Sequence, residues 1–76
     1  MNENVELLDV VALVADVPSR GLRRGQVGTV VEVLEPDVFE VEFSDDQGRT
    51  YATAPLHASQ LIVLHYEPVA AALAQS

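Results

Sequence analysis

The chain has 76 residues, of which 49% are apolar, and its twelve acidic side chains outnumber four arginines to give a formal net charge of −8. A chain of this length forms one small domain with a limited core, and it has no cysteine for a disulfide, so oligomerisation is the remaining common route to extra stability. The negative charge disfavours nucleic acid and anionic membranes as partners and favours a basic protein. No apolar run reaches the roughly 18 residues of a membrane span, and no positively charged leader is visible, so we expect a cytoplasmic protein.

The first predicted strand covers residues 9–17, where DVVALVADV is β-branched, apolar on both faces and short for a helix. Pro18 cannot donate to a sheet, so we expect the strand to end there. Two glycines then bracket a compact loop. This loop carries three of the four arginines, at Arg20, Arg23 and Arg24.

The second predicted strand covers residues 26–34. Strict alternation of side chains places Val31 and Val33 on the core face and Glu32 on the outer face. Gly28 inside this strand indicates a bulge or the close approach of another backbone.

The third predicted strand covers residues 38–43, with Phe39, Val41 and Phe43 on the core face. Its other face carries Glu40 and Glu42. Matching the core faces of the two strands predicts that Val33 pairs with Phe39, Val31 with Val41, and Glu32 with Glu40. The connecting loop then has an odd number of residues, and we favour five over three because Pro36 disfavours a helical conformation in the residue before it. Like charges directly opposite one another are destabilising, so the glutamate pair is better explained by a basic partner than by folding.

The rest of the chain predicts short elements separated by turn signals. Residues 44–50 form a hairpin turn with Gly48 at positive φ. The elements that follow are a strand over residues 50–54 ended by Pro55, a 3₁₀ turn within residues 56–60, and a strand over residues 61–66. The fold class is therefore all-β: a closed, SH3-like small barrel of five antiparallel strands with one 3₁₀ turn before the last strand. We place this barrel at residues 1–68, followed by a flexible or short helical tail at residues 69–76.

No group of residues predicts catalysis. The chain has no cysteine nucleophile, and its serines lie in turn-like contexts without a nucleophile-elbow sequence, so we expect a protein that is not an enzyme. Only His57 and His65 are available as nitrogen ligands for zinc, and Asp45 with Asp46 offers too few oxygens for calcium, so no cofactor or metal is expected. We expect a surface or capping role for His57.

Two sets of residues are candidate binding surfaces. The acidic set faces outward beside apolar side chains, a mixture that is typical of protein-binding faces. The arginine set either balances nearby acids on a solvated loop or grips a carboxylate or phosphate with its guanidinium groups. The predicted partner-binding residues are Glu32, Glu40 and Glu42 in the acidic set, and Arg20, Arg23 and Arg24 in the arginine set.

The segment GLRRGQVGTVVEVL resembles the KOW motif of small barrels in ribosomal and transcription proteins. This resemblance implies a nucleic-acid-associated or ribosome-associated barrel, although KOW domains that bind RNA are usually basic and this chain is acidic. The positions that carry it are Gly21, Gly25, Val27, Gly28 and Val30.

A longer resemblance runs from LLDVVALVADVPSRGLRRGQVGTVVEVL through FEVEFSDDQGRTYA to QLIVLHY. This pattern is similar to the family of small bacterial proteins known as domain of unknown function 4926. The family implies an SH3-like small barrel with no established activity, whose partner is a small protein encoded beside it, in some cases toxin-like. The matching positions are Asp9, Val10, Gly21, Leu22, Gly25, Gly28, Val30, Glu42, Phe43, Gly48 and Leu61.

Three functions remain open at this point. The first is a non-enzymatic protein-interaction module, such as an antitoxin-like or immunity-like partner of a basic neighbouring protein. The second is a barrel that reads nucleic-acid phosphates through its arginines. The third is an accessory subunit of an enzyme, with a site at the mouth of the barrel near His57 and Tyr51.

Overall fold

A computed structural model describes residues 4–65 of the chain. The predicted tail at residues 69–76 and the domain boundary at residue 68 lie outside the described residues. Between residues 4 and 65 the structure contains no helix with the length and apolar character needed to cross a membrane.

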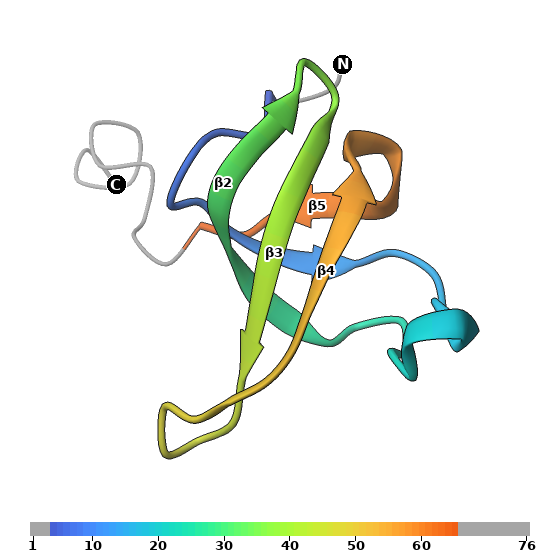
Figure 1. Ribbon diagram of the computed structural model, residues 1–76, viewed down its shortest axis with the longest axis vertical. Coiled ribbons are helices and arrows are strands. Elements are labelled where there is room, and N and C mark those ends of the chain that lie inside the picture. Colours follow the sequence, from blue (N-terminus) through green and yellow to red (C-terminus); the bar gives the residue numbers. More distant parts are fainter. Residues whose placement is uncertain (1–3, 66–76) are drawn as a thin grey trace, which may run out of the picture.

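The described chain is all-β, with five antiparallel strands in one sheet, as predicted (Figure 1). The strands follow the order β4-β3-β2-β1-β5, and each pairs antiparallel with its neighbours. Two short 3₁₀ helices complete the fold, η1 after β1 and η2 directly before β5. The elements are β1 (Val10–Leu13), η1 (Pro18–Arg20), β2 (Val27–Glu35), β3 (Val38–Ser44), β4 (Thr50–His57), η2 (Ala58–Gln60) and β5 (Leu61–Val63).

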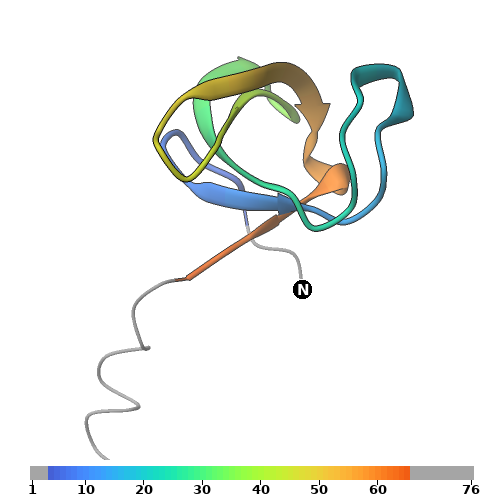
Figure 2. The same cartoon turned by 90° about the horizontal axis from the view of Figure 1, so that it is seen from below.

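The sheet curls into a barrel-like shape around one core, but it is not closed (Figure 2). Strands β4 and β5 form its two edges, so the prediction of a closed barrel is wrong on this point. The two edges have few backbone groups with which to form hydrogen bonds to each other, because β5 has only three residues and β4 contains Pro55, which has no N–H to donate.

Three strands differ clearly in length from the prediction, and one of them is the last strand, which ends at Val63 although it was predicted to reach residue 66. Strand β1 ends at Leu13 because the chain bends after it, and Val17, predicted to lie in the same strand, forms an isolated bridge with Leu22 instead. Strand β4 continues through Pro55 to His57, although a proline was expected to end it. Proline is tolerated there because β4 is an edge strand, so the missing donor need not leave a ladder hydrogen bond unmade.

Strand β2 changes face halfway along its length. Val30 is fully buried opposite Val41, whereas the next pair in the ladder is Glu32 with Glu40. Val31 is left between these pairs as a bulge and is 41% exposed, so the prediction that it packs opposite Val41 is wrong. A bulge adds one residue to one strand only, and it therefore reverses the inward and outward positions that follow.

Beyond the bulge the predicted register is confirmed, but Val33 is 48% exposed and is not the buried core residue that was predicted. Val33 lies opposite Phe39 and Glu32 lies opposite Glu40. The connection to β3, however, is a tight turn between the paired residues Glu35 and Val38, not the five-residue loop that was predicted. A second register shift, between Val33 and Glu35, leaves one further residue of β2 unpaired, and this makes the short turn compatible with the observed pairing.

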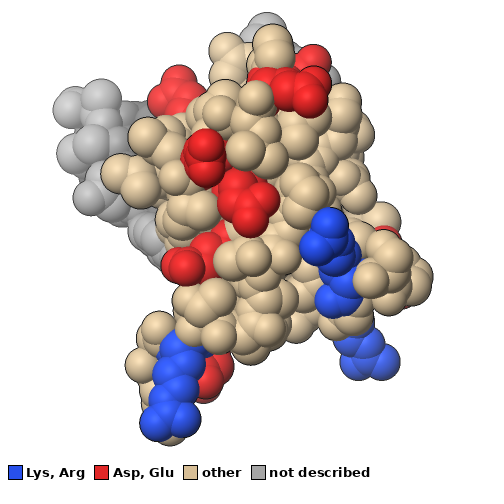
Figure 3. All heavy atoms as spheres, viewed as in Figure 1, with Lys and Arg blue, Asp and Glu red and all other residues tan. Residues whose placement is uncertain are grey.

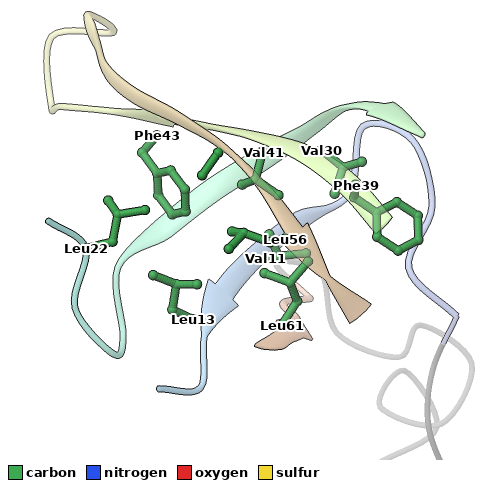
Figure 4. Close-up of a cluster of buried hydrophobic side chains, with 10 residues drawn as sticks. Val11, Leu13, Leu22, Val30, Phe39, Val41, Phe43, Leu56 and Leu61 are labelled. Carbon is green, nitrogen blue, oxygen red and sulfur yellow. The ribbon is translucent and has the colours of Figure 1, made fainter. Parts of the chain in front are cut away.

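The core lies inside the curl of the sheet (Figure 4). Phe39, Val41 and Phe43 are buried on one face of β3, as alternation predicted. The other members come from the remaining four strands and from the loop before β2, so one cluster joins every strand. The remaining buried residues are Val11, Leu13, Leu22, Val30, Ala54, Leu56 and Leu61.

Gly28 lies where the backbone of β3 approaches β2 closely, as its place inside a strand suggested. A Cβ atom at this position would lie 2.8 Å from the carbonyl oxygen of Glu42 and 2.7 Å from the side chain of Val41. The carbonyl belongs to the backbone and cannot rotate away, so the position requires the absence of a side chain.

We therefore predict that Gly28→Ala lowers the free energy of unfolding by about 1–3 kcal/mol, as overpacking of a filled core does. Gly48 is the matched control, because it has a φ of +80° but no atom lies within 4 Å of the position that a Cβ would take there, and asparagine tolerates such a backbone. Gly48→Asn should cost less than about 1 kcal/mol. Urea denaturation of both variants measures the difference, and equal losses would contradict this account of Gly28.

Candidate functional site

The acidic set forms a surface on the outer side of β2 and β3, which we call the acidic face and define as Glu32, Glu40 and Glu42. Glu40 lies between Glu32 on one side and Pro55 on the other, and Glu42 lies between two threonines in the next row. Figure 3 shows acidic side chains along the middle of the side of the molecule where β2, β3 and β4 face the viewer. The bulge at Val31 creates this arrangement, since strict alternation from the buried Val30 would have turned Glu32 toward the core.

Within residues 4–65 the Glu32–Glu40 pair has no counter-charge in contact with it. Residues directly opposite one another in antiparallel strands have Cβ atoms about 5 Å apart, so two carboxylates meet here across the ladder. Within residues 4–65 neither carboxylate makes an ion pair or accepts a hydrogen bond. The pair therefore opposes folding weakly, and nothing within the described chain offsets that cost.

Apolar side chains border the acidic face. Val31, Val33 and Leu34 are 41%, 48% and 43% exposed on the same stretch of β2. Leu8 lies beside this stretch, because its N–H donates to the carbonyl oxygen of Val30 over 2.8 Å, and it is 71% exposed with a φ of 72°. A positive φ is unfavourable for leucine, so a strained backbone here presents an apolar side chain to solvent.

The arginine set lies on the loop of residues 18–25, which we call the arginine loop. Several contacts hold this loop in place. Val17 and Leu22 exchange two backbone hydrogen bonds across it, of 2.8 and 3.1 Å, and Leu22 is only 2% exposed in the core. Gly21 and Gly25 take positive φ values of 67° and 91°, as the bracketing glycines suggested. The loop is thus anchored by Leu22, while its neighbours remain at the surface.

Arg20, Arg23 and Arg24 are all exposed, and within residues 4–65 none of them makes an ion pair. The carboxylate of Asp16 is near, but its Oδ1 accepts the backbone N–H of Arg24 over 2.8 Å and so supports the loop itself. The side chain of Gln26 similarly accepts the backbone N–H of Arg23 over 2.6 Å. The interpretation that the arginines balance nearby acids therefore finds no support within the described residues.

The structure does not bring the acidic face and the arginine loop together. The nearest member of the acidic face, Glu42, pairs with Thr29, which follows the last residue of the loop by four positions along β2. Within residues 4–65 no hydrogen bond or ion pair joins the two sets. The two sets are separate surfaces.

The other polar candidates have structural roles. The Nδ1 atom of His57 accepts the backbone N–H of Ser59, and Gln60 accepts the N–H of His57 in return, which confirms the capping role at η2. Asp45 accepts backbone N–H groups of Gln47 and Arg49, as turn chemistry predicts. Among the residues that the structure describes, no three His, Cys, Asp or Glu side chains are grouped to hold a metal ion.

Sequence reasoning did not anticipate the setting of Tyr51. This residue lies at a register irregularity in β4, and its hydroxyl accepts a hydrogen bond of 3.1 Å from Gln26, at the end of the arginine loop. Its ring packs beside Phe43, with ring centres 6.3 Å apart, and 49% of the residue is exposed. Because Gln26 and Tyr51 are far apart in sequence and no motif links them, no sequence signal could have indicated the contact.

A comparison with family models finds one match, to the family described as domain of unknown function (DUF4926), over residues 7–63. The matched segment contains all five strands. No curated protein matches the chain. No solved structure matches it either.

The anchoring of the arginine loop gives a testable prediction. Leu22→Ala removes a buried side chain and should lower the free energy of unfolding by about 2–5 kcal/mol. The double change Arg23→Ala with Arg24→Ala removes only exposed, unpaired side chains and should change it by less than about 0.5 kcal/mol. Urea denaturation tests both, and a large loss in the arginine variant would mean that these side chains support the fold.

Proposed function

The chain belongs to the DUF4926 family, and we propose that it is a non-enzymatic protein-interaction module that holds a basic partner on its acidic face. The observation that carries this proposal is the pairing of Glu32 with Glu40 across β2 and β3 without any cation beside them in the described chain. A partner that places a lysine or arginine between the two carboxylates would turn a repulsive pair into an attractive site.

The geometry favours a partner over a purely structural role for these residues. Facing glutamates add nothing to the packing of the sheet and repel each other, and the bulge at Val31 is what keeps Glu32 outside. Glu42 extends the negative surface by one row along β3, so a partner could present more than one cation.

Exposed aliphatic side chains provide the apolar part of the interface. Protein-binding surfaces combine a desolvated apolar centre with polar groups that fix orientation. Val31 and Leu34 lie on the same stretch of β2 as Glu32, and each is more than 40% exposed. A partner that covers them would also exclude water from the ion pairs and so strengthen them.

The most specific form of the proposal is an antitoxin-like or immunity-like role in the cytoplasm, in which this chain neutralises a small basic protein. A net charge of −8 accelerates encounter with a basic target, and rapid capture is what a neutralising partner requires. The partner itself is defined here by chemistry: a folded protein with a cationic patch next to apolar side chains.

The test uses the two carboxylates of the pair. Glu32→Gln, alone or with Glu40→Gln, should weaken retention of the partner when the chain is used for affinity capture from its source cells, and high salt should have the same effect. The same substitution should raise the free energy of unfolding of the isolated chain by roughly 0.2–1 kcal/mol, because it removes the like-charge contact. This combination of lost binding and gained stability distinguishes a binding role from a structural one.

Asp46→Asn is the matched control, since it removes one negative charge from the exposed β3–β4 turn, away from the acidic face. It should leave both partner capture and stability nearly unchanged. If Asp46→Asn weakens capture as much as Glu32→Gln does, the attraction is a property of net charge, and the acidic face is not the docking surface.

A further inference from the structure

The arginine loop and Tyr51 together have the parts of a second binding site, separate from the acidic face. The loop contributes guanidinium groups without carboxylate partners in the described chain, and Tyr51 contributes a half-exposed aromatic ring. We propose that this site binds a nucleotide, with the phosphate held by Arg23 and Arg24 and the base stacked on the ring of Tyr51.

The first support is the way the loop is built. Its backbone N–H groups are largely satisfied within the protein: that of Arg23 by Gln26, that of Arg24 by Asp16, and that of Gly25 by the carbonyl oxygen of Leu13. An anion would therefore be bound by side chains and not by a nest of backbone donors. Guanidinium groups on a fixed backbone suit phosphate, because each offers two parallel donors to two oxygens.

The second support is the link between the loop and the ring. One side chain, Gln26, accepts a hydrogen bond from the backbone of Arg23 and donates another to the hydroxyl of Tyr51. The Tyr51 hydroxyl thus lies within about 8 Å of the Arg23 backbone nitrogen, given the size of an amide group and ordinary hydrogen-bond lengths. The loop that carries the arginines and the ring that would stack on the base are therefore neighbours in the fold.

The third support is that the ring is already fixed in place. Phe43 packs beside it from the core, and Gln26 holds its hydroxyl, yet 49% of Tyr51 remains exposed. An exposed aromatic ring that is held by two contacts loses less entropy than a free ring when a base stacks on it, and stacking of this kind tolerates any base. The site therefore predicts little preference among the four bases.

The negative charge of the chain weakens the binding of an anionic nucleotide at the arginine loop. Glu42, the nearest member of the acidic face, pairs with Thr29, four residues after the loop, so its negative charge opposes the binding of an anion there. Asp16 is closer, but its Oδ1 already accepts the N–H of Arg24. We therefore expect weak binding that falls steeply as salt is added.

The experiment is a titration of the ¹⁵N-labelled chain at low salt with two probes, adenosine monophosphate and a short single-stranded oligonucleotide. Both should shift the amide signals of Gln26, Tyr51 and the arginine loop and leave those of Glu32 and Glu40 in place. Tighter binding of the oligonucleotide would identify a nucleic-acid strand as the source of the nucleotide, and equal binding would identify free nucleotides. No shifts up to about 10 mM of either probe would overturn the proposal.

Substitutions locate the site. Arg23→Ala with Arg24→Ala should weaken binding by about tenfold or more, and Tyr51→Leu by about fivefold or more, whereas Tyr51→Phe keeps the ring and should bind nearly as well. Arg49→Ala is the matched control for Arg23→Ala, because it removes the same charge from an exposed position on the β3–β4 turn. Equal weakening by these two single variants would show general electrostatic attraction and overturn the site.

This proposal and the role of the acidic face can fail separately. Glu32→Gln with Glu40→Gln should remove partner capture without weakening nucleotide binding. The arginine variant should do the reverse. If an acidic peptide shifts the same amide signals more strongly than either nucleotide probe, the loop is a carboxylate site, and the assignment to nucleotides is wrong.

Discussion

The structure depends on the contact between β2 and β3 where Val30 meets Val41 with no exposed surface on either side chain. Every other strand is attached to this pair: β1 pairs with β2, β4 pairs with β3, and β5 joins the sheet only through β1. Gly28 makes the contact possible, because the backbone of β3 occupies the space that a side chain there would fill. In a domain of this size a single buried pair is a large share of the core, so the approach of these two strands determines how tightly the sheet can curl.

The bulge at Val31 lets one strand serve two purposes. Before it, β2 directs Gly28 and Val30 into the core, and after it the strand directs Glu32 outward beside Glu40. Without the extra residue the same sequence would place a carboxylate among buried aliphatic side chains, where an unpaired charge is very costly. The acidic face is thus a product of backbone geometry as much as of composition. This is why the surface lies over the second half of β2 and not over the first.

Much of this fold follows from the sequence. The parts that do not follow from it have a common physical cause. The turn glycines, the core face of β3 and the opposition of Glu32 to Glu40 follow from alternation and turn chemistry, which are local properties. The bulge cannot be predicted in this way, because Val31 is an ordinary strand residue. The bulge forms there because Val30 packs in the core while Glu32 must stay outside it. The length of β4 depends on its being an edge, which is a property of the whole sheet. For the candidate sites, the sequence indicated the charged residues and placed Tyr51 near His57, but it did not indicate the link between Tyr51 and the arginine loop, which exists only after folding.

The polar side chains of the described residues divide into those that hydrogen-bond within the fold and those that do not. Short or amide side chains stabilise turns by accepting backbone N–H groups, and the residues that do so are Asp9, Asp16, Asp45, Gln26, His57 and Gln60. No glutamate or arginine side chain within residues 4–65 makes a hydrogen bond or an ion pair there, although both kinds are present on the surface. Opposite charges that could have neutralised each other are instead kept on separate surfaces, one on the sheet and one on an anchored loop. Charges that do not stabilise the fold, and that the fold holds apart, remain available to bind ligands of opposite charge.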